Sequence, residues 1–236
     1  MDLKQTLFII CSDHGHTGIA DTEKKYIKVG KIADVLSACG VDARDPKSDL
    51  FRSPVDDNTC LIKDTAGLMH IFLRKGLSEN YSWRQPPDAS HVKSLLHLLC
   101  AKVQQQSQNE KEDRSGIGNR LLQGIDAILY HDYQQNNYQI HYLRRGAYSP
   151  GEPIAEDVSQ GAEYLPMKTL LDEMTCGNSG DIILIPRYLE GFRFESKEAT
   201  NSTHGSFARS DMLVPLIIAS PFNPDLIDQH FADVVS

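Results

Sequence analysis

The chain has 236 residues, of which 40% are hydrophobic and 24% charged, and acidic side chains outnumber basic ones by 32 to 24, for a net charge of −8. A chain of this length and composition can bury a large core without disulfides or a structural metal. No apolar run approaches the roughly 20 residues that a membrane span needs. The negative charge argues against a nucleic-acid backbone as the main partner, because such binding needs clustered positive charge.

The cysteine pattern argues against cross-linking. The count is odd and no two cysteines are spaced as CxxC, so neither a disulfide framework nor a thiolate zinc site is expected. We therefore expect free, mostly buried thiols. The five are Cys11, Cys39, Cys60, Cys100 and Cys176.

Strand and helix signals alternate from the start of the chain. Residues 6–11 (TLFIIC) form a continuous apolar, β-rich run, which predicts a strand buried on both faces, as in a parallel sheet. Apolar residues then recur at helical spacing over 29–36. Strands are predicted over 58–64 and 68–73, with Ala66-Gly67 between them.

The middle of the chain continues this alternation. An apolar stripe over 92–103 predicts a second helix. Residues 104–116 are polar and without periodicity, which indicates an exposed, mobile loop or the frayed end of that helix. Strands are predicted over 125–131 and 139–143, separated by a turn at Asn136-Asn137.

The last third of the chain predicts a third helix over 167–174 and strands over 181–185 and 213–219. Pro215 is awkward in a central strand and indicates an edge or a bulge. Because strands and helices interleave, the expected fold class is α/β, with a largely parallel central sheet flanked by helices. No repeat or convincing linker is visible, so residues 1–236 are expected to form a single unit.

The tetrapeptide Ser12-Asp13-His14-Gly15 directly follows the first predicted strand. Ligands of open α/β sheets bind at the carboxyl ends of strands. An adjacent carboxylate and imidazole supply one oxygen and one nitrogen ligand for a divalent cation such as zinc, and Gly15 allows the sharp turn that lets both converge. The alternative is that Asp13 caps the next segment and His14 is an ordinary loop histidine.

A second signal is Thr203-His204-Gly205-Ser206, which precedes the last predicted strand. A lone loop histidine is usually solvated. The order of the motifs changes this interpretation: strand, SDHG, a long variable stretch, GDIILIP at 180–186, THGS at 203–206, then VPLIIASP at 214–221.

This ordered set resembles the carboxyl-terminal half of the alkaline phosphatase superfamily, most closely its type I phosphodiesterase and nucleotide pyrophosphatase branch. The stretches at 66–76 and 125–132 look like strands of the family's middle region. The resemblance implies that Asp13 and His14 bind one metal ion and His204 its neighbour, in a site with two divalent metals, zinc in this family. Such an ion pair clamps the attacking and leaving oxygens of a displacement at phosphorus.

Three other residues near these motifs need interpretation, and two of them have two readings each. His16 is a further metal ligand or phosphate donor, or a solvated loop histidine. Asp211 orients His204 as a hydrogen-bonding partner, or is a surface charge. Ser206 resembles a nucleophile, but no general base is visible beside it.

The chain departs from the family pattern in what it lacks. It contains no Asp-Gly dipeptide and no Asp-x-x-x-His pair, and no Ser, Thr or Cys nucleophile stands in the expected order. In the family these elements precede the SDHG motif. The chain is therefore expected to be the carboxyl-terminal half of a larger catalytic domain, with no catalytic nucleophile of its own.

Two functions follow from the resemblance. The first is a metal-dependent hydrolase of phosphate esters, of diester or nucleotide type, for which this chain supplies metal ligands and a separate segment supplies the nucleophile. The second is a non-catalytic or degenerate domain that keeps the fold and serves as a binding module. A sulfatase or phosphomutase remains a third alternative within the superfamily.

The strand at 6–11 also suggests a protein partner. Without neighbouring strands it would leave an unpaired edge and uncovered apolar area, which drive association. We therefore expect the chain to self-associate or to need an upstream partner segment.

Overall fold

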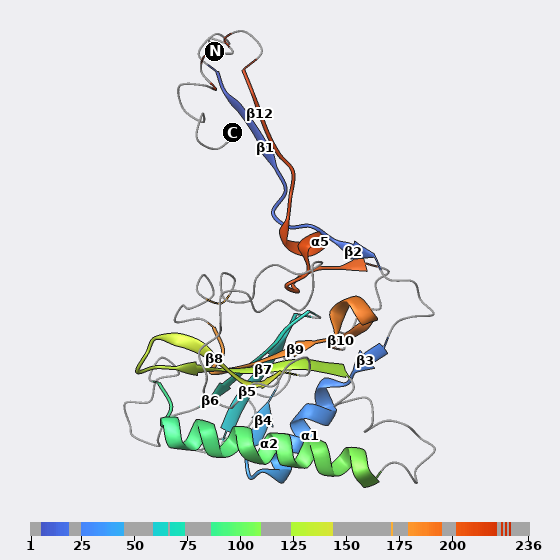
Figure 1. Cartoon of the computed structure of the whole chain (residues 1–236), viewed down its shortest axis with the longest axis vertical. Helices are drawn as coiled ribbons and strands as arrows, with labels where there is room; N and C mark the ends of the chain where they lie inside the picture. The colour runs from blue at the N-terminus through green and yellow to red at the C-terminus, as the bar shows by residue number, and fades with distance from the viewer. Residues whose placement is uncertain are drawn as a thin grey trace.

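The computed structural model of the chain contains a strand-rich body and a two-stranded ribbon that projects from it (Figure 1). It describes residues 6–18, 25–44, 59–65, 67–73, 86–109, 124–143, 171, 179–194, 202–220, 223, 225 and 227.

The body is built on a six-stranded sheet with the strand order β4-β5-β6-β9-β7-β8. Only the β4–β5 pair is parallel, and the other four pairs are antiparallel. Two of those pairs join neighbours in sequence, and Asn136 takes a positive φ of 51° in the β7–β8 turn. The strands are β4 (Asp42–Arg44), β5 (Thr59–Asp64), β6 (Met69–Leu73), β7 (Ile125–Asp132), β8 (Asn137–Leu143) and β9 (Ile182–Pro186).

Two helices, α1 (Val29–Ala38) and α2 (Ala89–Asn109), cover one face of this sheet (Figure 1). The apolar stripe of α1 is buried in that core, as helical spacing predicts. Helix α1 gives way to Gly40, whose φ of +83° favours glycine over residues with a side chain.

A second apolar cluster fills the opposite face of the sheet. Strand β9 shows the division: Ile182 and Leu184 pack with the helices, whereas Ile183 and Ile185 pack with the second cluster. That cluster includes Tyr188, Phe207 and Ala208, which come from the carboxyl-terminal part of the chain. Because β9 is packed on both faces, its sequence does not alternate between apolar and polar residues.

The expected fold class, a largely parallel sheet flanked by helices, is wrong. Among the described residues, those in strands (42%) outnumber those in helices (29%), and the main sheet is mixed and mostly antiparallel. Continuous apolar runs were taken as the mark of parallel strands. Here an antiparallel sheet has the same pattern, because helices cover one face and loops with short elements cover the other.

The predicted strands and the first two helices are confirmed as local elements, and several short elements were missed. The missed ones span only two to four residues, which is too short for periodicity to reveal. They include β3 (Lys25–Ile27), which pairs in parallel with β10 (Phe192–Phe194), and β2 (Thr17–Gly18), which pairs antiparallel with β11 (Ser202–Thr203). The 3₁₀ helix η3 (Tyr188–Glu190), the short helix α5 (Arg209–Met212) and strand β4 of the main sheet were missed as well.

The projecting ribbon consists of β1 (Phe8–Cys11) and β12 (Leu216–Ala219), paired antiparallel (Figure 1). Both strands were predicted, but the burial expected for residues 6–11 is wrong, because all four residues of β1 are exposed. Pro215 immediately precedes β12 instead of interrupting it.

Some other predictions can be compared with the structure only in part, because they extend beyond the described residues. Helix α2 continues to Asn109, and residues 110–116 of the predicted polar loop lie outside the described residues. Of the predicted third helix, only Leu171 is described, and it is helical and buried. No helix in the described ranges is long and apolar enough to cross a membrane. The described cysteines are free thiols, and Cys11, against expectation, is exposed.

One half-buried histidine of the sheet makes the free energy of unfolding depend on pH. The Gly180 N–H donates to Nδ1 of His70 at 3.1 Å, and burial lowers the pKa of His70 below its ordinary value of 6.5. The folded state therefore favours the neutral ring. As pH falls below 6.5 the unfolded chain takes up this proton first, so the free energy of unfolding should fall.

We expect His70→Asn, whose side-chain oxygen can accept the Gly180 N–H without titrating, to flatten this dependence. Urea unfolding at about pH 7.5 and about pH 5.5 measures it. His91→Asn, on the exposed side of α2, is the matched control. An unchanged difference in unfolding free energy between the two pH values in His70→Asn would contradict the assignment.

Candidate metal centre

Three histidines from the two ends of the chain gather at one place. The ring nitrogens of His14, His16 and His204 that could ligate a metal lie within 4.8 Å of one another. The rings of His14 and His204 are stacked, with centroids 3.6 Å apart and planes 14° from parallel. The ring of His16 lies 4.9 Å from that of His14 and 5.2 Å from that of His204.

The short β2–β11 ladder explains why His16 and His204 meet. Thr17 of β2 pairs with Thr203 of β11 in antiparallel register. His16 precedes Thr17 and His204 follows Thr203, so the two histidines occupy opposing positions where the ladder ends. His14 reaches the same place from the loop between β1 and β2.

A buried carboxylate holds the two loops together beneath the histidines. Asp211 of α5 is only 2% exposed. Its Oδ1 accepts a hydrogen bond from the Thr17 hydroxyl at 2.5 Å, and its Oδ2 accepts from the N–H and the hydroxyl of Ser206 at 3.1 and 2.7 Å. The same side chain therefore bonds the segment after SDHG and the segment after His204.

Gly15 brings the SDHG loop directly against α5. Its N–H donates to the carbonyl oxygen of Asp211 at 2.8 Å. A Cβ at this position would lie 1.9 Å from the carbonyl oxygen of Ser210, which no side chain can occupy. Glycine is thus required at residue 15 for close backbone contact rather than for its φ angle.

The THGS loop is anchored in a similar way against the turn between β5 and β6. Gly205 has a φ of +92°, in the region that favours glycine. A Cβ on Gly67 would lie 2.5 Å from the backbone of Gly205, so the two loops touch through their main chains. His204 is therefore held on both sides, by the ladder before it and by this contact after it.

Asp13 lies at the rim of the cluster, outside the group of three ligand nitrogens. Its side chain is 85% exposed, and its Oδ2 is 3.6 Å from Nε2 of His14. Its Oδ1 accepts hydrogen bonds from the His14 N–H at 3.1 Å and the Ser12 hydroxyl at 3.4 Å. Hydrogen bonding to its own backbone and the neighbouring His14 hold the pKa of Asp13 below its ordinary value.

The structure thus brings His14 and His204 together, adds His16, and leaves Asp13 bound to its own loop. Asp211 is buried, so the surface-charge reading is wrong, and its hydrogen bonds go to Thr17 and Ser206 rather than to His204. Ser206 is buried as well. Its hydroxyl donates to Asp211 and accepts from the Ala208 N–H, which gives it a structural role.

Two residues beside Asp211 were not found from the sequence. Tyr188 is fully buried, and burial together with the Asp211 carboxylate raises the pKa of its hydroxyl. The guanidinium of Arg193 is also buried and lies over the Tyr188 ring, 5.8 Å from its centroid. No spacing signal in the sequence marks either residue.

The donor set suits a borderline divalent cation. Imidazole nitrogens are favoured ligands of zinc, and three protein ligands with one open position are typical of catalytic zinc sites. His16 and His204 are exposed, so solvent or a small anion can reach the cluster. No oxygen ligand belongs to the group, which disfavours magnesium or calcium.

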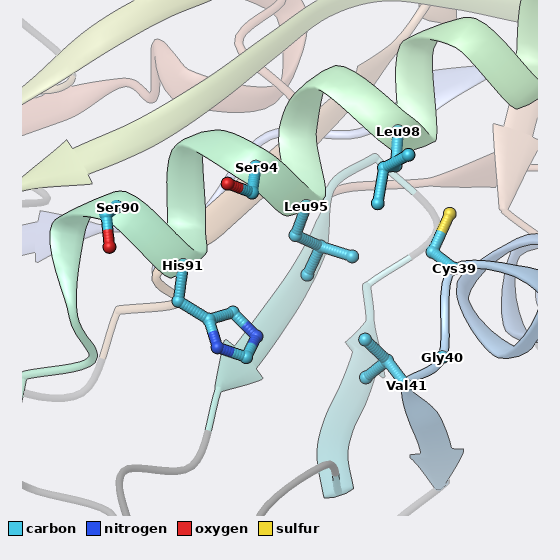
Figure 2. A pocket seen from close by; sticks show the side chains of 8 residues that line it. All are labelled: Cys39, Gly40, Val41, Ser90, His91, Ser94, Leu95 and Leu98. Atoms are coloured by element: carbon cyan, nitrogen blue, oxygen red, sulfur yellow. The ribbon is translucent and has the colours of Figure 1, made fainter.

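A hollow of about 400 Å³ lies between the residues that follow α1 and helix α2 (Figure 2). The close-up shows His91 and Leu95 of α2 facing Val41 across it. It lies with the helices, on the opposite face of the sheet from Phe207 and Ala208 of the THGS segment. Ser90, His91 and Ser94 give it a polar lining, but the described residues form a group of metal ligands only at His14, His16 and His204, so the histidine cluster is the stronger candidate.

Comparison with known proteins gives no further assignment. No protein-family model, curated protein or solved structure matches the chain.

Asp211→Ala should loosen both histidine loops. It removes the acceptor for three buried donor groups, which costs about 2–4 kcal/mol of unfolding free energy. Amide hydrogen exchange should accelerate at Gly15 and Ser206, whose N–H groups bond the backbone and side chain of residue 211.

The matched control is Asp34→Ala, which removes an exposed carboxylate of α1 that pairs only with Lys31 at 3.4 Å. It should change the unfolding free energy by less than about 1 kcal/mol. If Gly15 and Ser206 exchange at the same rate in Asp211→Ala as in the wild type, Asp211 does not hold the loops.

Proposed function

We propose that the chain binds a divalent metal ion of the zinc class through His14, His16 and His204. The observation that carries this proposal is the convergence of three imidazoles from two loops that share the buried Asp211. His14 contacts the Gly15 carbonyl oxygen through Nδ1 at 2.9 Å, which leaves its Nε2 as the nitrogen for a metal. In metal sites the second ring nitrogen of a ligating histidine commonly bonds a backbone carbonyl in this way.

We further propose that this ion serves phosphate-ester hydrolysis, with substrates of diester or nucleotide type. Support comes from the ordered SDHG and THGS motifs, whose histidines, His14 and His204, are two of the three that gather. A bound zinc ion would act as a Lewis acid toward a phosphoryl oxygen. The chain's own contribution is to orient three nitrogen donors and to leave the exposed side of His16 and His204 open to a small anion.

The three described imidazoles are enough for one ion. A two-zinc site needs roughly twice as many ligands, with open positions left for substrate. Asp13, at the rim, is the nearest described carboxylate that could join after turning away from its loop. In this proposal the attacking hydroxyl comes from residues outside the cluster, since Ser206 is buried and bonded to Asp211.

A second candidate is a non-catalytic metal-binding module that acts through protein contacts. The uncovered apolar ribbon of β1 and β12 favours it, because a self-sufficient enzyme has no need of such a surface. This candidate keeps the metal site and includes a protein partner at the ribbon.

Zinc titration of the purified chain tests the metal site. We expect one equivalent to bind, and replacement of His14, His16 or His204 by alanine to weaken binding by about 100-fold or more. Disturbing only an outer partner of a metal ligand costs about 10–100-fold, and the loss of a ligand costs more. Isothermal titration against a competing chelator measures the affinity.

His91→Ala and His97→Ala are matched controls, because both residues lie on the exposed side of α2. Neither variant should change zinc affinity. Equal affinity in all five variants would place the metal elsewhere and remove the proposal.

Turnover separates the two candidate functions. We expect the zinc-loaded chain alone to hydrolyse bis(nitrophenyl) phosphate at the background rate, because loss of a nucleophile typically costs about 10⁴–10⁶-fold. Inorganic phosphate should still perturb the visible spectrum of the cobalt-substituted chain if the site serves phosphate esters. No spectral response would favour the non-catalytic module, and chelator-sensitive turnover would show that the nucleophile lies within this chain.

A further inference from the structure

The histidine cluster lies at the base of the ribbon of β1 and β12. Cys11 ends β1 and Leu216 begins β12, and these two residues form the last pair of the ribbon before its strands enter the body (Figure 1). His14 follows Cys11 by three positions. On the other strand, α5 and its Asp211 come shortly before Leu216. The first candidate ligand therefore stands where the ribbon meets the body.

The same two segments of the chain pair again on the other side of the cluster. After His14 and His16, Thr17 of β2 pairs with Thr203 of β11. Between the two ladders, the Gly15 N–H donates to the backbone of α5 at 2.8 Å. The order from the tip of the ribbon inward is therefore β1, His14, the Gly15 bond to α5, His16 and β2.

The ribbon is held more weakly than the sheet of the body. It has only four residue pairs, and every residue of β1 is exposed. The six-stranded sheet is packed on both faces, whereas an isolated two-stranded ribbon is marginally stable in water. A segment of this kind opens locally at a lower free energy than the core. We therefore expect the ribbon to separate without unfolding of the sheet.

Separation of the ribbon acts on one of the three histidines first. When it starts at the tip, it reaches His14 directly after the last pair of the ribbon, and only then the bond of Gly15 to α5. His204 stays with the body, because β11 lies on one side of it and the backbone contact with Gly67 on the other. Opening of the ribbon down to its base thus draws His14 away from His204.

We infer that metal binding at His14, His16 and His204 stabilises the ribbon, and that pairing of the ribbon strengthens metal binding. The inference rests on the proposed metal site. The ligand nitrogens lie within 4.8 Å of one another while the ribbon is paired, and a ligand that binds only this form stabilises it by mass action. The coupling is reciprocal, because each event changes the other by the same factor. Metal availability then sets how often the apolar strands of the ribbon are paired.

Amide hydrogen exchange of β1 and β12 tests the coupling, measured by NMR without zinc and with free zinc at about 100 times its dissociation constant. Zinc should slow this exchange by at least about 5-fold and by up to about 100-fold, because opening of the ribbon then requires loss of a ligand from the ion. The amides of Gln134 and Gln135 are the control. They bond Asp132 in the β7–β8 turn at 2.9 and 3.2 Å, and zinc should leave their exchange unchanged.

The reverse effect is measured on zinc affinity. Ile10→Pro breaks the ladder of β1, because proline has no N–H and a fixed φ, and it should weaken zinc binding by about 5-fold or more. Ile10→Thr keeps a β-branched residue in the strand and should bind zinc as the wild type does. Protection of the amides of β7 and β9 against exchange shows that both variants remain folded.

The outcomes separate this coupling from the metal site itself. Zinc binding with unchanged exchange in β1 and β12, or with wild-type affinity in Ile10→Pro, would overturn the coupling and leave the proposed metal site standing. Equal slowing at Gln134 and Gln135 would also overturn it, because the effect would then not belong to the ribbon. If the wild-type chain binds no zinc, the metal site and the coupling both fail.

Discussion

The carboxylate of Asp211 is the interaction on which the candidate site depends. It bonds Thr17 and Ser206, and Thr17 lies 194 positions earlier in the chain. A buried carboxylate is unfavourable unless its oxygens accept enough hydrogen bonds. The hydroxyl of Thr17 and the N–H and hydroxyl of Ser206 meet that requirement. Because both loops meet at this one side chain, their histidines come to the same place.

The rest of the fold supplies a rigid base for this arrangement. The six-stranded sheet is buried on both faces, by α1 and α2 on one side and by Tyr188, Phe207 and Ala208 on the other. Phe207 and Ala208 stand between the THGS loop and α5, so the packing of the sheet also positions Asp211. The ribbon of β1 and β12 differs, since no labelled element of the body packs against it in Figure 1 and its apolar side chains are exposed.

Local structure was more predictable than topology. Periodicity located α1, α2 and five of the six strands of the main sheet, because each is long enough to show its burial pattern, whereas the three-residue β4 was missed. It did not give strand direction, since apolar residues on both faces of β9 look alike in parallel and antiparallel sheets. The short connection at Ala66-Gly67 and the turn at Asn136-Asn137 were the available signs of antiparallel pairing, as parallel neighbours need long crossovers.

The residues of the candidate site could be predicted from the sequence, but their contacts could not. Motif chemistry singled out His14, His16, His204 and Asp211, because histidines and carboxylates beside glycine stand out in a sequence. It could not show that Asp13 turns to its own loop or that Asp211 bonds Ser206, since those outcomes depend on contacts between distant segments. Elements of two residues, such as β2 and β11, carry no pattern, although their pairing sets the position of His16 against His204.

Segments from near the two ends of the chain hold His14 and His204 in contact. Nuclear Overhauser effects between the ring protons of His14 and His204, recorded on the metal-free chain, test this directly. Ring centroids 3.6 Å apart predict strong cross-peaks in the wild type and weaker ones in Asp211→Ala. Absence of any cross-peak between these rings, in a chain whose six-stranded sheet is folded, would contradict the account.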